Sequence, residues 1–273
     1  MTEFLEIPFL KNAVIGGILL SILLSVLSMF INLKNWSFIT VGISHATFGG
    51  LAIGFYMSIS PTIVGTLFAI IVGLLIAYIS RHGKIHEDVS IGILFSMSMA
   101  LGVIFITLTP NYNTDLFTFL FGNILTITTE DIYVLTIFTI FTLSFIFFNF
   151  QKIMYCCFDE DVAYTSGINT SFYYYFLILL IAVATVLSVK LVGVILASAM
   201  MILPVAFASQ IVWHYKALIS LSIFISVLMV LIGIYISYQL NLPSGATIVF
   251  LYSLFFSIIV GIKTTLRKIN VLS

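Results

Sequence analysis

The sequence predicts an all-α polytopic membrane protein that folds as one transmembrane domain over residues 1–273. Hydrophobic residues make up 62% of the chain and charged residues 7%, whereas a soluble domain carries about 25% charged residues. The apolar runs are long enough for helices that cross the hydrocarbon core, which need about 20 residues. A β-barrel would instead show shorter segments of alternating polarity. We therefore expect a multi-pass protein of the cell (cytoplasmic or inner) membrane.

The apolar runs predict about nine transmembrane helices, with eight as the alternative. Only Lys190 separates the sixth run from the seventh, so one of these two runs could be a re-entrant or broken helix. Irregular backbone at membrane depth is tolerated where protein buries it. The expected spans are residues 9–32, 38–58, 61–80, 91–109, 131–150, 173–189, 191–212, 217–238 and 245–263.

The basic residues predict the orientation, because cytoplasmic loops carry an excess of lysine and arginine. With the N-terminus outside and nine crossings, only Lys11 and Lys190 of the 10 basic residues lie outside. The C-terminus is then cytoplasmic. With eight spans, the basic residues would instead be spread over both sides of the membrane. The formal net charge is zero and no basic stripe is present, so we expect no nucleic-acid partner. The residues expected inside are Lys34, Arg81, Lys84, Lys152, Lys216, Lys263, Arg267 and Lys268.

His45 is the histidine that lies inside an apolar span. An ionisable residue at membrane depth is costly, so it usually faces a cavity, a partner or a substrate path. Small residues such as Gly42, Gly49 and Gly50 surround it, and small residues allow neighbouring helices to approach closely. A packed, hydrogen-bonded core histidine is the alternative interpretation.

The longest polar insert runs from Asn149 to Ser171. Asp159 and Glu160 come early in it, where acidic residues suit the N-terminus of a helix. Gly167 follows a few residues later, where glycine commonly ends a helix. The insert therefore predicts a short surface helix between two membrane helices, and a solvated loop is the alternative.

Two further positions are candidates for a function. Asp115 is an acid in an apolar neighbourhood, so it could attract a cation at the outer mouth, or it could cap the helix that follows. Pro204 lies inside an apolar run, where it removes a backbone hydrogen bond and is expected to kink the helix.

Several stretches carry a resemblance to a known family. Ser44-His45-Ala46 and the following Gly50-x-Ala52 resemble the second-helix signature of the metal-type ABC transporter permeases, which import zinc, manganese or iron. The resemblance covers most of the chain, from about Phe9 to Lys263, and its motifs fall in the family's order. Val41 and Asn241 depart from the family, which often has aspartate at these two positions. The other matching stretches are EDVSIGILFS, DLFTFLFGNIL, DEDVAYTSGI, LVGVILASAMMILPVAFA and ISYQLNLPSGATIV.

The resemblance implies the permease subunit of an ABC importer, surrounded by membrane lipid. It implies three protein partners: a cytoplasmic ATPase that holds the ATP, an extracellular metal-binding capture protein and a second permease copy. His45 would lie on the metal path, with Asp115 at the outer mouth and Pro204 as a kink. The ATPase would dock on the insert at 151–172. The residues implied for docking are Asp159, Glu160, Ala163, Tyr164 and Gly167.

The chain itself is not expected to be an enzyme or to bind a cofactor. The glycine-rich phosphate loop that ends in Gly-Lys-Ser/Thr is absent from the sequence, so a separate subunit would hydrolyse ATP. The transported ion is expected to be zinc first, then manganese or iron, because carboxylates favour manganese and two family carboxylates are missing here.

Two other classes of protein remain open. An ATP-independent secondary carrier or channel would not need the polar insert, and the inverted halves that many carriers show are not evident. An intramembrane metalloprotease would need His-Glu-x-x-His, which the sequence lacks.

Overall fold

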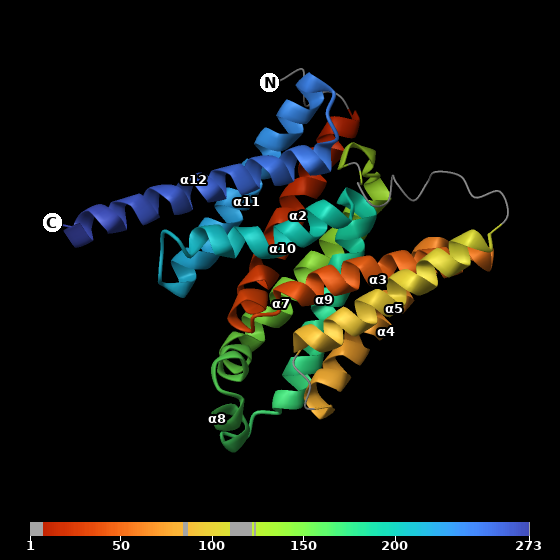
Figure 1. The fold of residues 1–273 in the computed structure, drawn as a ribbon, viewed down its shortest axis with the longest axis horizontal. Helices are drawn as coiled ribbons and strands as arrows, with labels where there is room; N and C mark the ends of the chain where they lie inside the picture. The colour runs from red at the N-terminus through yellow and green to blue at the C-terminus, as the bar shows by residue number, and fades with distance from the viewer. Residues whose placement is uncertain (1–7, 84–86, 110–121, 123, 273) are drawn as a thin grey trace.

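The computed structural model describes residues 8–83, 87–109, 122 and 124–272 (Figure 1). Over these residues the structure is helical and contains no β-strand, which confirms the predicted fold class. The helices are α2 (Pro8–Leu33), α3 (Ser37–Tyr56), α4 (Pro61–His82), α5 (Glu87–Thr107), a 3-10 turn η1 (Ile124–Thr126), α7 (Thr129–Phe158), α8 (Glu160–Thr165), α9 (Thr170–Val192), α10 (Val194–Ala208), α11 (Tyr215–Leu240) and α12 (Ser244–Leu272).

Among the described residues, eight helices are long and apolar enough to cross a membrane. The seventh expected span, 191–212, is instead the 15-residue helix α10. Gly193 separates α10 from α9, because its φ of 84° ends α9. A helix of 15 residues is about 22 Å long, shorter than the hydrocarbon core of about 30 Å. The described residues therefore match the alternative of eight spans, with α10 as an additional shorter apolar helix.

The helices run alternately between two ends of the molecule. At one end, which we call the α8 end, Arg81 pairs with Glu160, and Phe150 stacks on Tyr215 with ring centroids 5.5 Å apart. At the opposite end, Lys190 Nζ lies 2.7 Å from Asp131 Oδ1. Because α10 returns the chain towards the α8 end before α11 begins, α2 starts and α12 finishes at opposite ends of the described structure.

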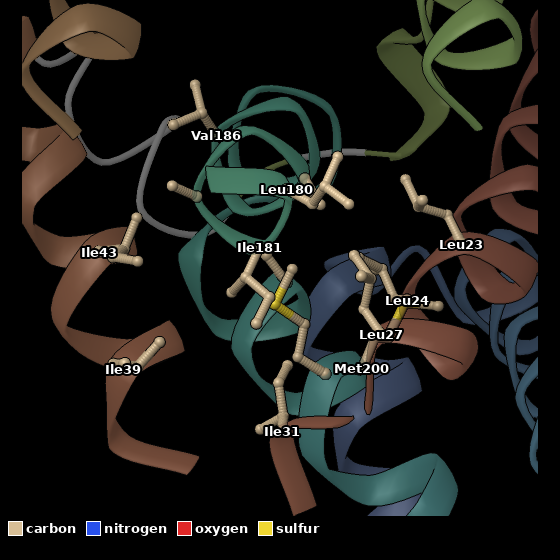
Figure 2. Close-up of a cluster of buried hydrophobic side chains, with 14 of the residues drawn as sticks. Leu23, Leu24, Leu27, Ile31, Ile39, Ile43, Leu180, Ile181, Val186 and Met200 are labelled. Atoms are coloured by element: carbon tan, nitrogen blue, oxygen red, sulfur yellow. The ribbon is translucent and has the colours of Figure 1, made fainter. Parts of the chain in front are cut away.

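Two groups of helices are visible in Figure 1, with α3, α4 and α5 packed together and α2, α7, α10, α11 and α12 forming the other group. Helix α9 contacts α4 and α3 on one side and α7, α10 and α2 on the other. Figure 2 shows the apolar core at this junction, where Ile43 of α3, Ile181 of α9 and Leu27 of α2 converge. All three side chains are fully buried. The helix that carries His45 is thus held against the centre of the molecule.

Glycines allow α3 to lie unusually close to its two neighbours. A Cβ on Gly50 would lie 2.8 Å from the Cα of Gly65 in α4, and a Cβ on Gly49 would lie 2.5 Å from the carbonyl oxygen of Ser98 in α5. Both distances are to backbone atoms, which cannot move aside as a flexible side chain does. Close backbone contact at small residues is how helices associate within membranes, so α3, α4 and α5 form one tightly packed unit.

We expect Gly50→Ala to lower the free energy of unfolding by about 1–3 kcal/mol, because overpacking forces the backbones of α3 and α4 apart. Thermal unfolding of the detergent-purified protein measures this change. Gly92→Ala is the matched control, since Gly92 is also helical and a Cβ there would meet nothing within 4 Å. Equal loss of stability in the two variants would contradict this account of the α3–α4 contact.

Candidate functional site

His45 lies near the middle of α3 and is half-buried. Its ring packs edge-on against Phe95 of α5, with centroids 5.1 Å apart and an interplanar angle of 85°. The Nδ1 atom is shielded from solvent and has no hydrogen-bond partner among the described residues. A buried polar atom without a partner carries a desolvation cost. Because this atom is enclosed by protein, a group outside the described residues could reach only the part of the half-buried His45 side chain that remains exposed.

The face of α3 that carries His45 is incompletely covered. Phe38 is exposed, and Val41 and His45 are half-buried. These residues follow one another at helical spacing and so lie along one face. Val41 precedes His45 by one turn, so the position where the related family often has an acid is here an apolar neighbour of the imidazole. The face offers one metal-ligating side chain.

A complete metal centre does not form among the described residues, which contain no group of three or more His, Cys, Asp or Glu side chains able to hold an ion. Asp115, the acid expected at the outer mouth, lies outside the described residues. The described part of the chain therefore presents one imidazole here rather than a complete set of metal ligands.

Asn241 has a backbone role at the opposite end from α8. It is the C-cap of α11 and adopts the left-handed conformation, with φ 52° and ψ 40°. Asparagine is one of the few residues besides glycine that commonly takes this conformation at a helix end. The amide at this position thus suits the turn between α11 and α12, and the exposed side chain is not part of the His45 surroundings.

The predicted surface helix is present as α8, a six-residue helix. Asp159 is its N-cap, and Asp159 Oδ1 accepts hydrogen bonds from the backbone N–H groups of Asp161 at 3.1 Å and Val162 at 3.0 Å. Gly167 follows its C-terminus with φ 80°, a conformation that glycine adopts without steric cost. Both ends of α8 are as predicted: an acidic residue caps its N-terminus, and a glycine follows its C-terminus.

The five predicted docking residues divide into those that build α8 and those that face outwards. Ala163 is fully buried and anchors the helix to the bundle, whereas Tyr164 is 72% exposed. Asp159 and Gly167 are engaged in the two caps. Val162, which the sequence did not single out, is 51% exposed and adds to the apolar surface. Tyr164 and Val162 are therefore the exposed large apolar side chains within α8.

Glu160 is the remaining docking candidate, and it forms an ion pair with Arg81 at the end of α4. The Arg81 guanidinium also lies over the ring of Tyr174 in α9, with Cζ 5.0 Å from the ring centroid. Sequence reasoning missed Arg81, which it used only as a basic residue for orientation. The pair joins residues 79 positions apart, and hydropathy gives no signal for such a pairing.

The second ion pair of the described chain lies at the opposite end. Lys190, near the end of α9, donates to Asp131 near the start of α7 at 2.7 Å. Asp131 also completes a capping box with Thr128. The ion pair fixes the start of α7 against the end of α9, whereas the capping box is local to α7, and neither contact involves α8 or α3.

Pro204 lies inside α10 and is buried. The kink expected at this proline stays a prediction. Val205 and Met201 beside it are also buried, so this part of α10 faces protein rather than lipid.

Comparison with known proteins places the whole chain in one group. Residues 6–263 match the family described as the ABC 3 transport family. The manganese import system permease protein ScaB of Streptococcus parasanguinis is 34% identical over 272 residues, covering 98% of this chain and 97% of ScaB. The manganese transport system membrane protein MntC of Listeria monocytogenes is 34% identical over 254 residues, covering 93% of this chain and 90% of MntC. A probable iron transport system membrane protein of Haemophilus influenzae is 30% identical, covering 94% and 95% of the two chains.

Solved structures agree with these relatives. The chain superposes on the structure titled PsaBC from Streptococcus pneumoniae in complex with Fab, with a TM-score of 0.82, 32% identity and coverage of 94% and 93%. A putative metal-chelate type ABC transporter in an inward-facing conformation has the same fold, with a TM-score of 0.75 at 12% identity. The match over nearly the full length shows that this multi-pass membrane protein belongs to the ABC 3 transport family.

Proposed function

We propose that the chain is the membrane-spanning permease subunit of an ABC importer for a divalent transition metal, with manganese first and iron next. The observation that carries this proposal is the 34% identity to the manganese permease ScaB over 98% of the chain. The expectation that zinc comes first finds no support among these relatives, whose names give manganese and iron. Manganese and iron therefore come before zinc in the proposed order.

His45 is proposed as a ligand that the ion meets on its path. Support comes from the half-buried imidazole in an apolar span and from the incompletely covered face of α3. An imidazole that faced lipid hydrocarbon would be costly, so we infer that a second copy of the chain or the path itself covers this face. A second copy would bring a second imidazole to the path, which would compensate for the ligand missing at Val41.

Helix α8 is proposed as the docking element for a cytoplasmic ATPase subunit. An exposed tyrosine is a frequent anchor in protein interfaces, and Tyr164 lies on a helix whose ends are fixed by caps. The proposed orientation puts α8 in the cytoplasm with the N-terminus outside, because the excess of lysine and arginine then falls inside. A capture protein would deliver the ion at the opposite end.

ATP-dependent uptake by the reconstituted complex tests this proposal. The permease and its ATPase subunit would be placed in proteoliposomes, and accumulation of manganese, iron and zinc would be measured with and without ATP. We expect manganese accumulation that requires ATP and the ATPase subunit. Uptake without the ATPase subunit would favour the secondary carrier or channel. Accumulation of zinc alone would contradict the proposed order of metals.

A further inference from the structure

Arg81 connects three helices at the α8 end. Its guanidinium pairs with Glu160 of α8, lies over the Tyr174 ring of α9 and approaches Thr170 Oγ1 at 3.5 Å. The Arg81 side chain is 24% exposed and that of Glu160 36%. The pair is thus partly shielded from water, where charged contacts are screened less than at a fully exposed surface.

Tyr174 continues this line of contacts to the helix that carries His45. Its ring packs edge-on against Trp36 with centroids 5.3 Å apart and an interplanar angle of 84°. Trp36 is 1% exposed and is the N-cap of α3. His45 follows nine residues later on the same helix, about 14 Å along its axis. Contacts therefore run without interruption from α8 through Arg81 and Tyr174 to the start of α3.

Helix α4 provides a second, parallel connection. Arg81 belongs to the last turn of α4, and α4 is packed backbone to backbone against α3 where Gly65 meets Gly50. Because two helices in such close contact move together, a force on Arg81 acts on α3 both through α4 and through Trp36. The contact between α4 and α3 thus gives Arg81 a second connection to α3.

We propose that Arg81 is a positioning residue that transmits displacement of α8 to α3 and so to His45. The inference rests on the proposed function and deepens it, since it names the residue through which the ATPase would act on the metal path. A guanidinium suits this role because it stays charged, pairs with a carboxylate in a fixed planar geometry and stacks on an aromatic ring at the same time, which a lysine cannot do.

A double-mutant cycle in the reconstituted complex tests the inference. Arg81→Gln, Glu160→Gln and the double variant would be assembled with the ATPase subunit in proteoliposomes, and the manganese transported per ATP hydrolysed would be measured. We expect each single variant to lower this ratio about tenfold, a size typical of coupling between sites. The double variant should match either single one, because the two residues act as one link. Arg81→Lys should recover only part of the ratio.

Lys190→Gln is the matched control, because it removes the other ion pair of the described chain, between α7 and α9 at the opposite end. It should leave the transport ratio unchanged. Copurification of the ATPase subunit and thermal unfolding would be recorded for every variant. Four results would overturn the inference: an unchanged ratio in Arg81→Gln, additive losses in the double variant, an equal loss in Lys190→Gln, or a loss explained by dissociation of the ATPase subunit.

The wild-type complex separates failure of this inference from failure of the proposed function. Absence of ATP-dependent metal transport by the wild type would overturn both. Normal transport by the wild type together with normal ratios in the Arg81 and Glu160 variants would overturn the role of Arg81 alone.

Discussion

Replacing His45 by alanine is expected to reduce ATP-dependent manganese accumulation by about 10- to 100-fold, a loss comparable to that from disturbing a metal ligand's support. The imidazole is the metal-ligating side chain on the incompletely covered face of α3, and neither Val41 nor Phe38 can replace it. Metal accumulation in proteoliposomes that contain the assembled complex gives the measurement. The ATPase subunit should still copurify, because His45 lies far along α3 from α8.

The control for His45→Ala is Ser44→Ala, the neighbouring position on the same helix. Ser44 Oγ donates to the carbonyl of Val41 at 2.9 Å within α3, so its removal should leave transport near the wild-type level. His45→Gln keeps a polar side chain of similar length but lacks the imidazole nitrogen, and should transport no better than His45→Ala. Wild-type uptake by His45→Ala would remove His45 from the metal path.

Replacing Tyr164 by alanine should weaken binding of the ATPase subunit by about 30-fold or more, the loss expected for an aromatic interface anchor worth about 2 kcal/mol. The side chain is 72% exposed and makes no contribution to the caps of α8, so the stability of the permease should change by less than about 0.5 kcal/mol. Binding of the purified ATPase subunit to the permease in nanodiscs measures the affinity.

Tyr133→Ala is the matched control for this second variant. Tyr133 is 67% exposed and lies in the first turns of α7, at the end away from α8. Its removal should leave the affinity for the ATPase subunit unchanged. If both tyrosine variants bind normally, α8 does not dock through Tyr164. Ala163 and Gly167 are poor choices for this test, because changing a buried anchor or a left-handed glycine would alter α8 itself.

Most of the helices could be predicted because a membrane span leaves a strong hydropathy signal. The span expected at 217–238 is α11, Tyr215–Leu240, and the span expected at 61–80 is α4, Pro61–His82, so the bounds differ by two residues or fewer at each end. Other expected helix ends are less accurate, because α12 continues nine residues beyond 263 and α7 continues eight residues beyond 150. Polar residues such as Gln151 and Lys152 end the apolar run, yet nothing there breaks the helix. Hydropathy locates the membrane, whereas a helix ends only at a cap, here Asp159.

The candidate site was predictable only where a residue type alone carries the information. His45 could be selected because an ionisable group in an apolar run is unusual. Arg81 could not be connected to Glu160, because such a pairing depends on how α4 and α8 meet. The sequence likewise could not tell that Ala163 points inwards and Tyr164 outwards, since six residues are too few for a periodic pattern.

The short length of α10 has a consequence for how the surrounding bilayer acts on the protein. A lipid-facing helix of about 22 Å would force nearby acyl chains to thin or tilt around it, at a cost for each ångström of mismatch. Most of α10 is buried by its neighbours, including Met200, Met201 and Val205, so protein rather than lipid fills the missing length. Helix α7 is 30 residues long, and only 22% of its most apolar window is buried. A change in acyl-chain length is therefore expected to affect the lipid-facing helix α7 more than α10, most of which is covered by protein.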